Sequence, residues 1–295
     1  MGTITDKLNH LINTKEGIRQ ELNRAYETEE ISTSDTFNSY IQKLEEHPYY
    51  IMRYIERSIE SIKLSNATSI GSYAFKSCSS LTSVSFPVAT SIGESAFSGC
   101  SKLTSVSFPV ATSVGIYTFQ NCSGLTEVSI PNAKSIGNYT FQGCSSLTSV
   151  SFPEATSIED YAFQYCSKLT EITEVSFPVA TSIGYGAFSA CSSLTEVSFP
   201  KATSIGNYAF YYCTGLTEVS FPEATSISDS AFRDCSNLTT IYVGTNTSTI
   251  CTLSSTNAFT GCTNLTNIYV PASLVDSYKS ATNWSNYASK IKATP

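Results

Sequence analysis

A unit of 22 residues recurs through most of this 295-residue chain, and it constrains the fold more than any other feature. One copy reads LTSVSFPVATSIGESAFSGCSK over residues 81–102. A cysteine marks the series, and a phenylalanine lies three residues before each one: Cys78, Cys100, Cys122, Cys144, Cys166, Cys191, Cys213, Cys235 and Cys262. Such a period is typical of a solenoid, whose units stack because one unit cannot bury its apolar residues alone.

Each unit contains a short strand pattern. Val84 and Phe86 alternate with Ser83 and Ser85, and Pro87 then ends the strand because it has no N–H for a ladder. Further inward positions of the unit are Leu81, Ala89, Ile92, Ala96, Phe97 and Cys100. The predicted fold class is an α+β repeat, a solenoid of about ten parallel strands between a helical N-terminal segment and a helical C-terminal cap.

Two insertions interrupt the period. The stretch LTEITEV contains three extra residues, which we place at 169–171, so that the next unit begins at Ile172. Five extra residues fall within 244–256. Both insertions are expected to form loop bulges.

The recurring pattern FPxATSIGxYAFxxCxxLTxVSFP resembles the BspA-type leucine-rich repeat, in which an L-x-x-L-x-L strand is followed by an I-G-x-x-A-F-x-x-C segment. The resemblance covers residues 59–271. It implies a leucine-rich-repeat solenoid, and proteins of this family are associated with adhesion to host matrix proteins and to other cells. The tail IYVPASLVDSYKSATNWSNYASKI also resembles the C-terminal end of such proteins, which predicts a helical cap over 272–295.

The first 57 residues differ from the rest in composition. They hold 17 charged residues, whereas the other 238 residues hold 24. We therefore predict three regions: a helical segment and solenoid cap at 1–57, the solenoid at 58–271, and the cap at 272–295. The stretch TDKLNHLINTKEGIRQEL resembles the helical start of repeat proteins of gut bacteria and their phages, including tail-associated ones, and its near-heptad spacing permits self-association.

Composition also excludes several classes of function. A net charge of -7 argues against nucleic acid, and the chain has no apolar run long enough to insert into a membrane. Residues 1–30 lack the features of a secretory signal, so we expect a cytoplasmic protein, or a virion-associated one that is released by lysis. His10 and His47 are the only histidines, and no catalytic or dinucleotide-binding motif occurs, which predicts a protein that is not an enzyme and needs no cofactor or metal.

The nine periodic cysteines are predicted to pack in the core as small buried thiols. Disulfides between stacked coils and a metal site are the alternatives. The number of cysteines fits a reducing compartment better than an oxidising one. Cys251 lies outside the period, in the second insertion, and is predicted to be the most reactive thiol.

Two columns of outward side chains are candidates for ligand binding on the strand face. The first column contains the carboxylates Glu174, Glu196 and Glu218, which would repel one another when stacked and would favour a cation or a basic partner. The second column contains Ser176, Ser198 and Ser220, whose hydroxyls suit a polar partner such as a glycan or a protein chain. The alternative interpretation is that both columns only keep the exposed face of the sheet hydrated and the protein soluble.

A tyrosine-rich edge is the second candidate surface. Tyr161 and Tyr208 belong to a column that also holds Tyr73, Tyr117 and Tyr139, which indicates a structural role in covering the coils. In contrast, Tyr165, Tyr211 and Tyr212 depart from the repeat and are the better binding candidates.

The leading hypothesis is a non-enzymatic recognition or adhesion protein that binds a protein or a cell-surface glycan through a rigid repeat surface. A phage or prophage tail-associated receptor-binding component is the favoured setting, because lysis releases such a protein without a signal. The alternative is a cytoplasmic scaffold that binds other proteins.

Overall fold

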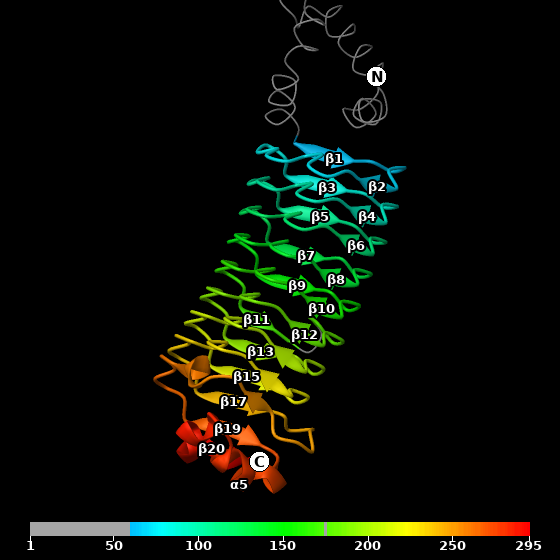
Figure 1. Cartoon of the computed structure of the whole chain (residues 1–295). Coiled ribbons are helices and arrows are strands. Elements are labelled where there is room, and N and C mark those ends of the chain that lie inside the picture. The colour runs from blue at the N-terminus through cyan, green and yellow to red at the C-terminus, as the bar shows by residue number, and fades with distance from the viewer. Residues whose placement is uncertain (1–59, 174–175) are drawn as a thin grey trace, which may run out of the picture.

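The computed structural model describes residues 60–173 and 176–295, which wind into a stack of coils (Figure 1). The first coil is drawn in blue and the last in red, so the coils follow one another in sequence order along one axis. The helical segment predicted for residues 1–57, with its proposed self-association, lies outside the described residues.

In most coils the first strand pairs in parallel with the equivalent strand of the next coil. Ser61, for example, pairs with Ser83, and Ser83 pairs with Ser105. These strands are β1 (Ser61–Lys63), β3 (Ser83–Ser85), β5 (Ser105–Ser107), β7 (Glu127–Ser129), β9 (Ser149–Ser151), β11 (Glu171–Ile172), β13 (Glu196–Ser198), β15 (Glu218–Phe221), β17 (Thr240–Val243) and β19 (Asn267–Val270). The prediction of about ten parallel strands is confirmed.

Each coil up to the second insertion also contains a second, two-residue strand, which the sequence analysis did not foresee. These strands are β2 (Ser69–Ile70), β4 (Ser91–Ile92), β6 (Ser113–Val114), β8 (Ser135–Ile136), β10 (Ser157–Ile158), β12 (Ser182–Ile183), β14 (Ser204–Ile205), β16 (Ser226–Ile227) and β18 (Thr252–Leu253). A strand of two residues is too short to show an alternating pattern, so hydrophobic periodicity could not reveal it.

The predicted inward positions form the core. Leu81, Phe86, Ala96 and Phe97 are fully or almost fully buried, and the same columns are buried in the following coils. Phenylalanine rings stack from coil to coil: the centroids of Phe97 and the next ring of its column lie 5.4 Å apart, with only 3° between the ring planes. Stacked rings at this distance contribute roughly 1 kcal/mol beyond the area that they bury.

Threonine side chains join the coils at the start of the first strand. The backbone N–H and the Oγ1 of Thr104 both donate to the carbonyl oxygen of Thr82, at 2.8 and 3.0 Å. Thr217 and Thr195 repeat this arrangement. The recurrence of threonine in the repeat therefore has a structural reason, because each side chain adds a hydrogen bond to the coil before it.

The periodic cysteines are buried and form no disulfides, and thiols of this series also link the coils. The Sγ of Cys100 donates to the carbonyl oxygen of Phe75 in the preceding coil at 3.1 Å, and seven further thiols do the same. Cys251, predicted to be the most reactive thiol, is no more accessible than the periodic cysteines. Cys251 is fully buried, and burial raises its pKa to about 12, so that the nucleophilic thiolate does not form near neutral pH.

The C-terminal residues close the stack with mixed structure instead of a purely helical cap. They form three short helices and then a strand: η2 (Ala272–Leu274), α5 (Val275–Ser280), η3 (Trp284–Lys290) and β20 (Ile291–Ala293). The strand β20 pairs in parallel with β19 and so extends the sheet by one strand. Within the described residues, no helix is long and apolar enough to cross a membrane.

Both ladders are interrupted together at one contact between coils, which we call the seam; the first ladder alone is also interrupted between β9 and β11. The strand pairing stops at β5 and β6 and resumes at β7 and β8, and Figure 1 shows β7 set further from β5 than β5 is from β3. A Cβ added at Gly115 would lie 2.7 Å from the backbone of the coil before it, but at Gly137 it would lie 3.4 Å away. The opposite side of the seam stays closed, because the N–H of Phe119 donates to the carbonyl of Thr140 at 2.9 Å.

One substitution in the repeat lies at the seam. Ile130 occupies the position of Phe86 and Phe108, whose rings stack 5.5 Å apart. Stacking resumes at Phe152, which lies 5.6 Å from the next ring of the column. The aliphatic Ile130 interrupts the ring stack at the coil where the strand pairing is lost.

We expect the seam to open more readily than the other contacts between coils. Within the described coils, the N–H groups of Phe108 and Thr126 have no hydrogen-bond partner, whereas those of Phe86 and Thr148 donate to the neighbouring coil. Amide hydrogen exchange of Phe108 and Thr126 should therefore be at least tenfold faster than that of Phe86 and Thr148. The variant Ile130→Phe should slow exchange at the seam, and equal rates at all four amides would contradict the assignment.

Candidate recognition surface

The structure corrects the first column of candidate carboxylates. The strand β11 pairs Glu171 with Glu196, and β13 pairs Glu196 with Glu218. Glu171 therefore takes the place that we predicted for Glu174, which lies outside the described residues. The three inserted residues follow Ile172 instead of preceding it.

The error came from a degenerate sequence pattern. LTEITEV offers two equally spaced hydrophobic steps, one beginning at Leu169 and the other at Ile172. In the structure Leu169 is fully buried, and its N–H donates to the carbonyl of Cys166 at 3.1 Å, as Leu147 does to Cys144. The constant spacing of three residues between the cysteine and this leucine was the signal that could have identified the register.

Of the predicted serine column, two of the three hydroxyls lie on the strand face. Ser198 and Ser220 pair in neighbouring strands and are half-buried. Ser176 is buried at the end of the insertion, where its Oγ accepts a hydrogen bond from the N–H of Thr173 at 3.3 Å. It helps to close the inserted loop and is not available on the surface.

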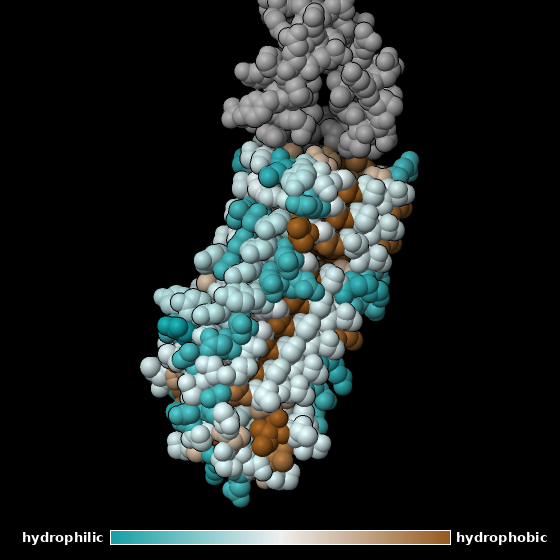
Figure 2. Space-filling model, viewed as in Figure 1, coloured by the Kyte–Doolittle hydropathy of each residue, from teal (hydrophilic) through white to brown (hydrophobic). Residues whose placement is uncertain are grey.

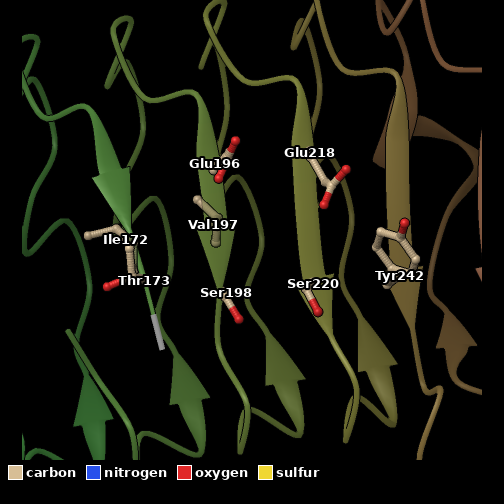
Figure 3. Close-up of a pocket in the computed structure, with 8 residues that line it drawn as sticks. All are labelled: Ile172, Thr173, Glu196, Val197, Ser198, Glu218, Ser220 and Tyr242. Carbon is tan, nitrogen blue, oxygen red and sulfur yellow. The ribbon is translucent and has the colours of Figure 1, made fainter. Parts of the chain in front are cut away.

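Four of the predicted residues line one hollow on the strand face, which we call the sheet-face pocket. Its volume is about 390 Å³, and its lining residues are Ile172, Thr173, Glu196, Val197, Ser198, Glu218, Ser220 and Tyr242. Figure 3 shows the two glutamates on adjacent strands in the upper half of the view and the two serines below them. Thr173 lies on one side and Tyr242 on the other, so carboxylates, hydroxyls and a phenol gather in one place.

The acidic side chains of this surface are not neutralised. The ion pairs among the described residues are Lys134–Glu154, Lys201–Glu223 and Arg233–Asp234. Glu171, Glu196 and Glu218 are exposed and belong to none of them. Because equivalent residues of adjacent strands lie about 5 Å apart, the three carboxylates reinforce one negative potential.

Tyr242 adds a hydrogen-bond donor to the sheet-face pocket. Its pKa is raised above the ordinary value, first by desolvation and then by the Glu218 carboxylate and Tyr269. The phenol therefore keeps its proton at neutral pH. Its ring is held in place by stacking on Tyr269, with centroids 5.0 Å apart.

The rest of the strand face is rich in small polar side chains. Figure 2 shows pale and teal residues over most of this face, with narrow brown bands between them. Within the described residues, no group of three or more histidine, cysteine, aspartate or glutamate side chains is placed to hold a metal ion. The chemistry that this face offers is hydrogen bonding and the attraction of positive charge.

Tyrosines stack along one edge of the solenoid. Tyr139 lies between Tyr117 and Tyr161, with centroids 4.8 and 4.9 Å away and nearly parallel rings. Tyr185 continues the series to Tyr208, at 5.1 and 5.4 Å from its two neighbours. Because these rings cover one another's faces, they present edges and hydroxyls to solvent, which agrees with the predicted structural role of Tyr161 and Tyr208.

The three tyrosines that we singled out do not form one group. Tyr211 is half-buried and packs its ring edge-on against Tyr208, with centroids 5.7 Å apart and planes 88° apart. Tyr165 and Tyr212 are 55% and 52% exposed and occupy the same place in their coils. The structure thus separates Tyr211, which extends the stack, from two projecting rings.

The repeat also identifies the family of the chain. Residues 48–170 and 156–288 match the BspA type leucine rich repeat region, in six copies. The chain therefore belongs to the BspA-type leucine-rich-repeat family. No curated protein gives a significant match.

Several solved structures are similar. A leucine rich cell surface protein from Faecalibacterium prausnitzii is 21% identical, with a TM-score of 0.37, over 80% of this chain and 83% of that chain. The leucine rich repeat protein of T. pallidum is 23% identical, with a TM-score of 0.38, over 80% and 87%. A pneumococcal vaccine antigen is 18% identical, with a TM-score of 0.42, over 81% and 78%. Similarity at this level concerns the fold and does not identify a partner.

Proposed function

We propose that this chain is a non-enzymatic recognition protein whose solenoid binds a partner protein at the sheet-face pocket, through an exposed basic segment of that partner. The observation that carries the proposal is the meeting of Glu196, Glu218 and Tyr242 in one hollow with no cation beside them among the described residues. Lysine and arginine side chains carry positive charge and N–H groups, from which the carboxylates would accept hydrogen bonds.

The rigidity of the surface supports this function. The glutamates stand on paired strands, and the ring of Tyr242 is stacked, so the groups are positioned before a partner arrives. Binding then orders few side chains of this chain, and more of the interaction free energy remains as affinity. An extended basic segment could also run across several strands, because Glu171 continues the acidic column beyond the pocket.

The proposal is tested with fluorescently labelled peptides rich in lysine and arginine, scored by anisotropy against the full chain. Glu196→Gln with Glu218→Gln should weaken binding about tenfold, which corresponds to about 1.4 kcal/mol. The loss should shrink as salt rises from 50 to 500 mM, because exposed charges are screened beyond roughly 10 Å at 0.1 M salt.

A matched control removes the same charge elsewhere. Glu154→Gln with Glu223→Gln changes two carboxylates that are paired with Lys134 and Lys201. This pair of substitutions should leave peptide binding nearly unchanged. If both double variants weaken binding equally, only the net charge matters, and the sheet-face pocket is not the site.

The biological setting that we propose is a phage or prophage tail, in a virion released by lysis. The resemblance of the TDKLNHLINTKEGIRQEL segment to tail-associated proteins supports it, but that segment lies outside the described residues. Mass spectrometry of purified virions from the source strain, together with binding of the purified chain to intact cells, tests this setting. Absence from virions and binding only to proteins of a cell lysate would favour a cytoplasmic scaffold instead.

A further inference from the structure

In every coil the residue directly before the periodic cysteine adopts a left-handed backbone conformation. Its occupants, with φ between 58° and 80°, are Ser77, Gly99, Asn121, Gly143, Tyr165, Ala190, Tyr212, Asp234 and Gly261. Glycine adopts this conformation without a steric cost, and asparagine and aspartate tolerate it better than other residues. A tyrosine at this position is unfavourable for the backbone, yet two coils carry one.

Packing does not compensate for this backbone strain. The side chains of Tyr165 and Tyr212 are 55% and 52% exposed, more than any other large hydrophobic residue in the described part of the chain. Tyr139, which also has a positive φ, is stacked on both faces. Tyr212 has one ring neighbour, Tyr211 at 6.1 Å, and no ring contact involves Tyr165 within the described residues. A strained, exposed aromatic side chain indicates a binding role.

The two rings are held at a fixed spacing. The N–H groups of Tyr165, Ala190 and Tyr212 donate to carbonyls of the next coil at 2.9, 2.7 and 2.9 Å. The two tyrosines are therefore two coil heights apart, or about 10 Å. Ala190 lies between them and has only a methyl group, so the space between the rings stays open.

This spacing fits a particular class of ligand. In a β-1,4-linked polysaccharide each sugar is rotated by half a turn, so the same apolar ring face recurs at every second sugar. That recurrence is close to two coil heights of the solenoid. Gln164, Tyr211 and Arg233 lie one position before this column in their coils and carry an amide, a phenol and a guanidinium group.

The edge differs from the sheet-face pocket in charge. Asp234 lies in the same column as the two tyrosines, and its carboxylate is paired with Arg233 at 3.5 Å. A neutral ligand with apolar faces and hydroxyls therefore suits this edge better than a basic peptide. We propose that Tyr165 and Tyr212 form a subsite for a β-1,4-linked polysaccharide that runs along the solenoid axis, with one ring under every second sugar.

Affinity electrophoresis tests the subsite, with the full chain run in native gels that contain hydroxyethylcellulose, a soluble β-1,4-glucan. Retardation by this polymer and none by dextran, which is α-linked, is expected. Tyr165→Ala or Tyr212→Ala should weaken binding at least tenfold, whereas Tyr165→Phe should retain it because the ring face makes the contact. Tyr73→Ala is the matched control, since Tyr73 is 46% exposed and also has a positive φ.

Two further variants separate binding from folding and test the spacing. Tyr165→Gly and Tyr212→Gly should abolish retardation without lowering the thermal midpoint, because glycine accepts the positive φ. Tyr212→Ala combined with Ala190→Tyr moves one ring by a single coil and should not restore binding.

The proposal is overturned if no retardation occurs, if dextran retards the chain equally, or if the alanine variants bind as the parent does. Restored binding in the shifted-ring variant would also contradict the spacing argument. Glu196→Gln with Glu218→Gln should leave retardation unchanged, so the two proposed sites can fail independently.

Discussion

Raising the pH from 7.5 to 10 under reducing conditions should lower the free energy of unfolding by roughly 4 kcal/mol or more, a large part of the stability of an ordinary domain. The cause is a set of nine buried thiols, eight from the periodic series together with Cys251. Burial raises the pKa of Cys122, Cys144, Cys166, Cys191, Cys213, Cys235 and Cys251 above the ordinary 9.0, to about 12 for Cys144 and Cys191. For Cys100 and Cys262 a hydrogen bond with a neighbouring thiol is the main cause.

The sign follows from the proton count. Below pH 9 both the folded and the unfolded chain keep these protons, so the stability that they contribute is fully present. Between pH 9 and 12 the unfolded chain loses protons that the folded chain retains, and stability falls as pH rises. At pH 10 a thiol with a folded-state pKa of about 12, such as Cys144, Cys191 or Cys251, accounts for about 1.4 kcal/mol, and the other thiols act in the same direction.

Urea unfolding followed by circular dichroism at a series of pH values measures the effect. The matched variant carries Cys144→Ala, Cys166→Ala and Cys191→Ala, which remove three of the titrating thiols. It should be less stable than the parent at pH 7.5 but should lose about a third less stability between pH 7.5 and 10. An identical pH dependence in both proteins would show that the thiols are not responsible.

Replacing Trp284 with alanine should lower the free energy of unfolding by roughly 3 to 5 kcal/mol. Trp284 is fully buried, and its Nε1 donates to the carbonyl oxygen of Cys251 at 2.7 Å. Its ring packs against Phe259 and Tyr278, with centroids 6.1 and 5.3 Å away. The substitution leaves a cavity at the last coil and an unpaired carbonyl, so the closing elements should detach first.

Urea denaturation gives the size of this effect, and limited proteolysis gives its place. Early cleavage in Trp284→Ala should fall after residue 250, while the first coils stay intact. Trp284→Phe is the control: it keeps an aromatic ring but loses the donor, and should cost about 1 to 3 kcal/mol. A loss below 1 kcal/mol in the alanine variant would show that the C-terminal elements do not stabilise the solenoid.

The repeat predicted the solenoid, its parallel strands and its inward columns. The same apolar positions recur in every unit, so only one register buries all of them. It did not predict how the coils are joined. The thiol of Cys100 and the hydroxyl of Thr104 serve as hydrogen-bond donors between coils, and nothing in a hydrophobic pattern distinguishes a donating thiol from a packed one. The C-terminal strand β20 was also missed, since the IKA sequence lies outside the repeat.

The candidate surfaces were predicted in outline. Glu196 and Glu218 do meet in a hollow, because residues 22 apart in the repeat become neighbours in the sheet. The sequence placed Tyr242 in the column of the serines but did not predict that it lines the sheet-face pocket. A pocket depends on how neighbouring side chains pack, which the repeat pattern does not describe. Tyr165 is exposed whereas Tyr211 is half-buried, and this difference depends on backbone conformation, which the repeat pattern does not predict.

The seam divides the described coils into a block of three and a block of seven. The sheet-face pocket and the Tyr165–Tyr212 pair both belong to the larger block. An opening between β5 and β7 would therefore leave both proposed sites together in the larger block. Loosening of the solenoid at the seam would thus leave the spacing of the groups within each proposed site unchanged.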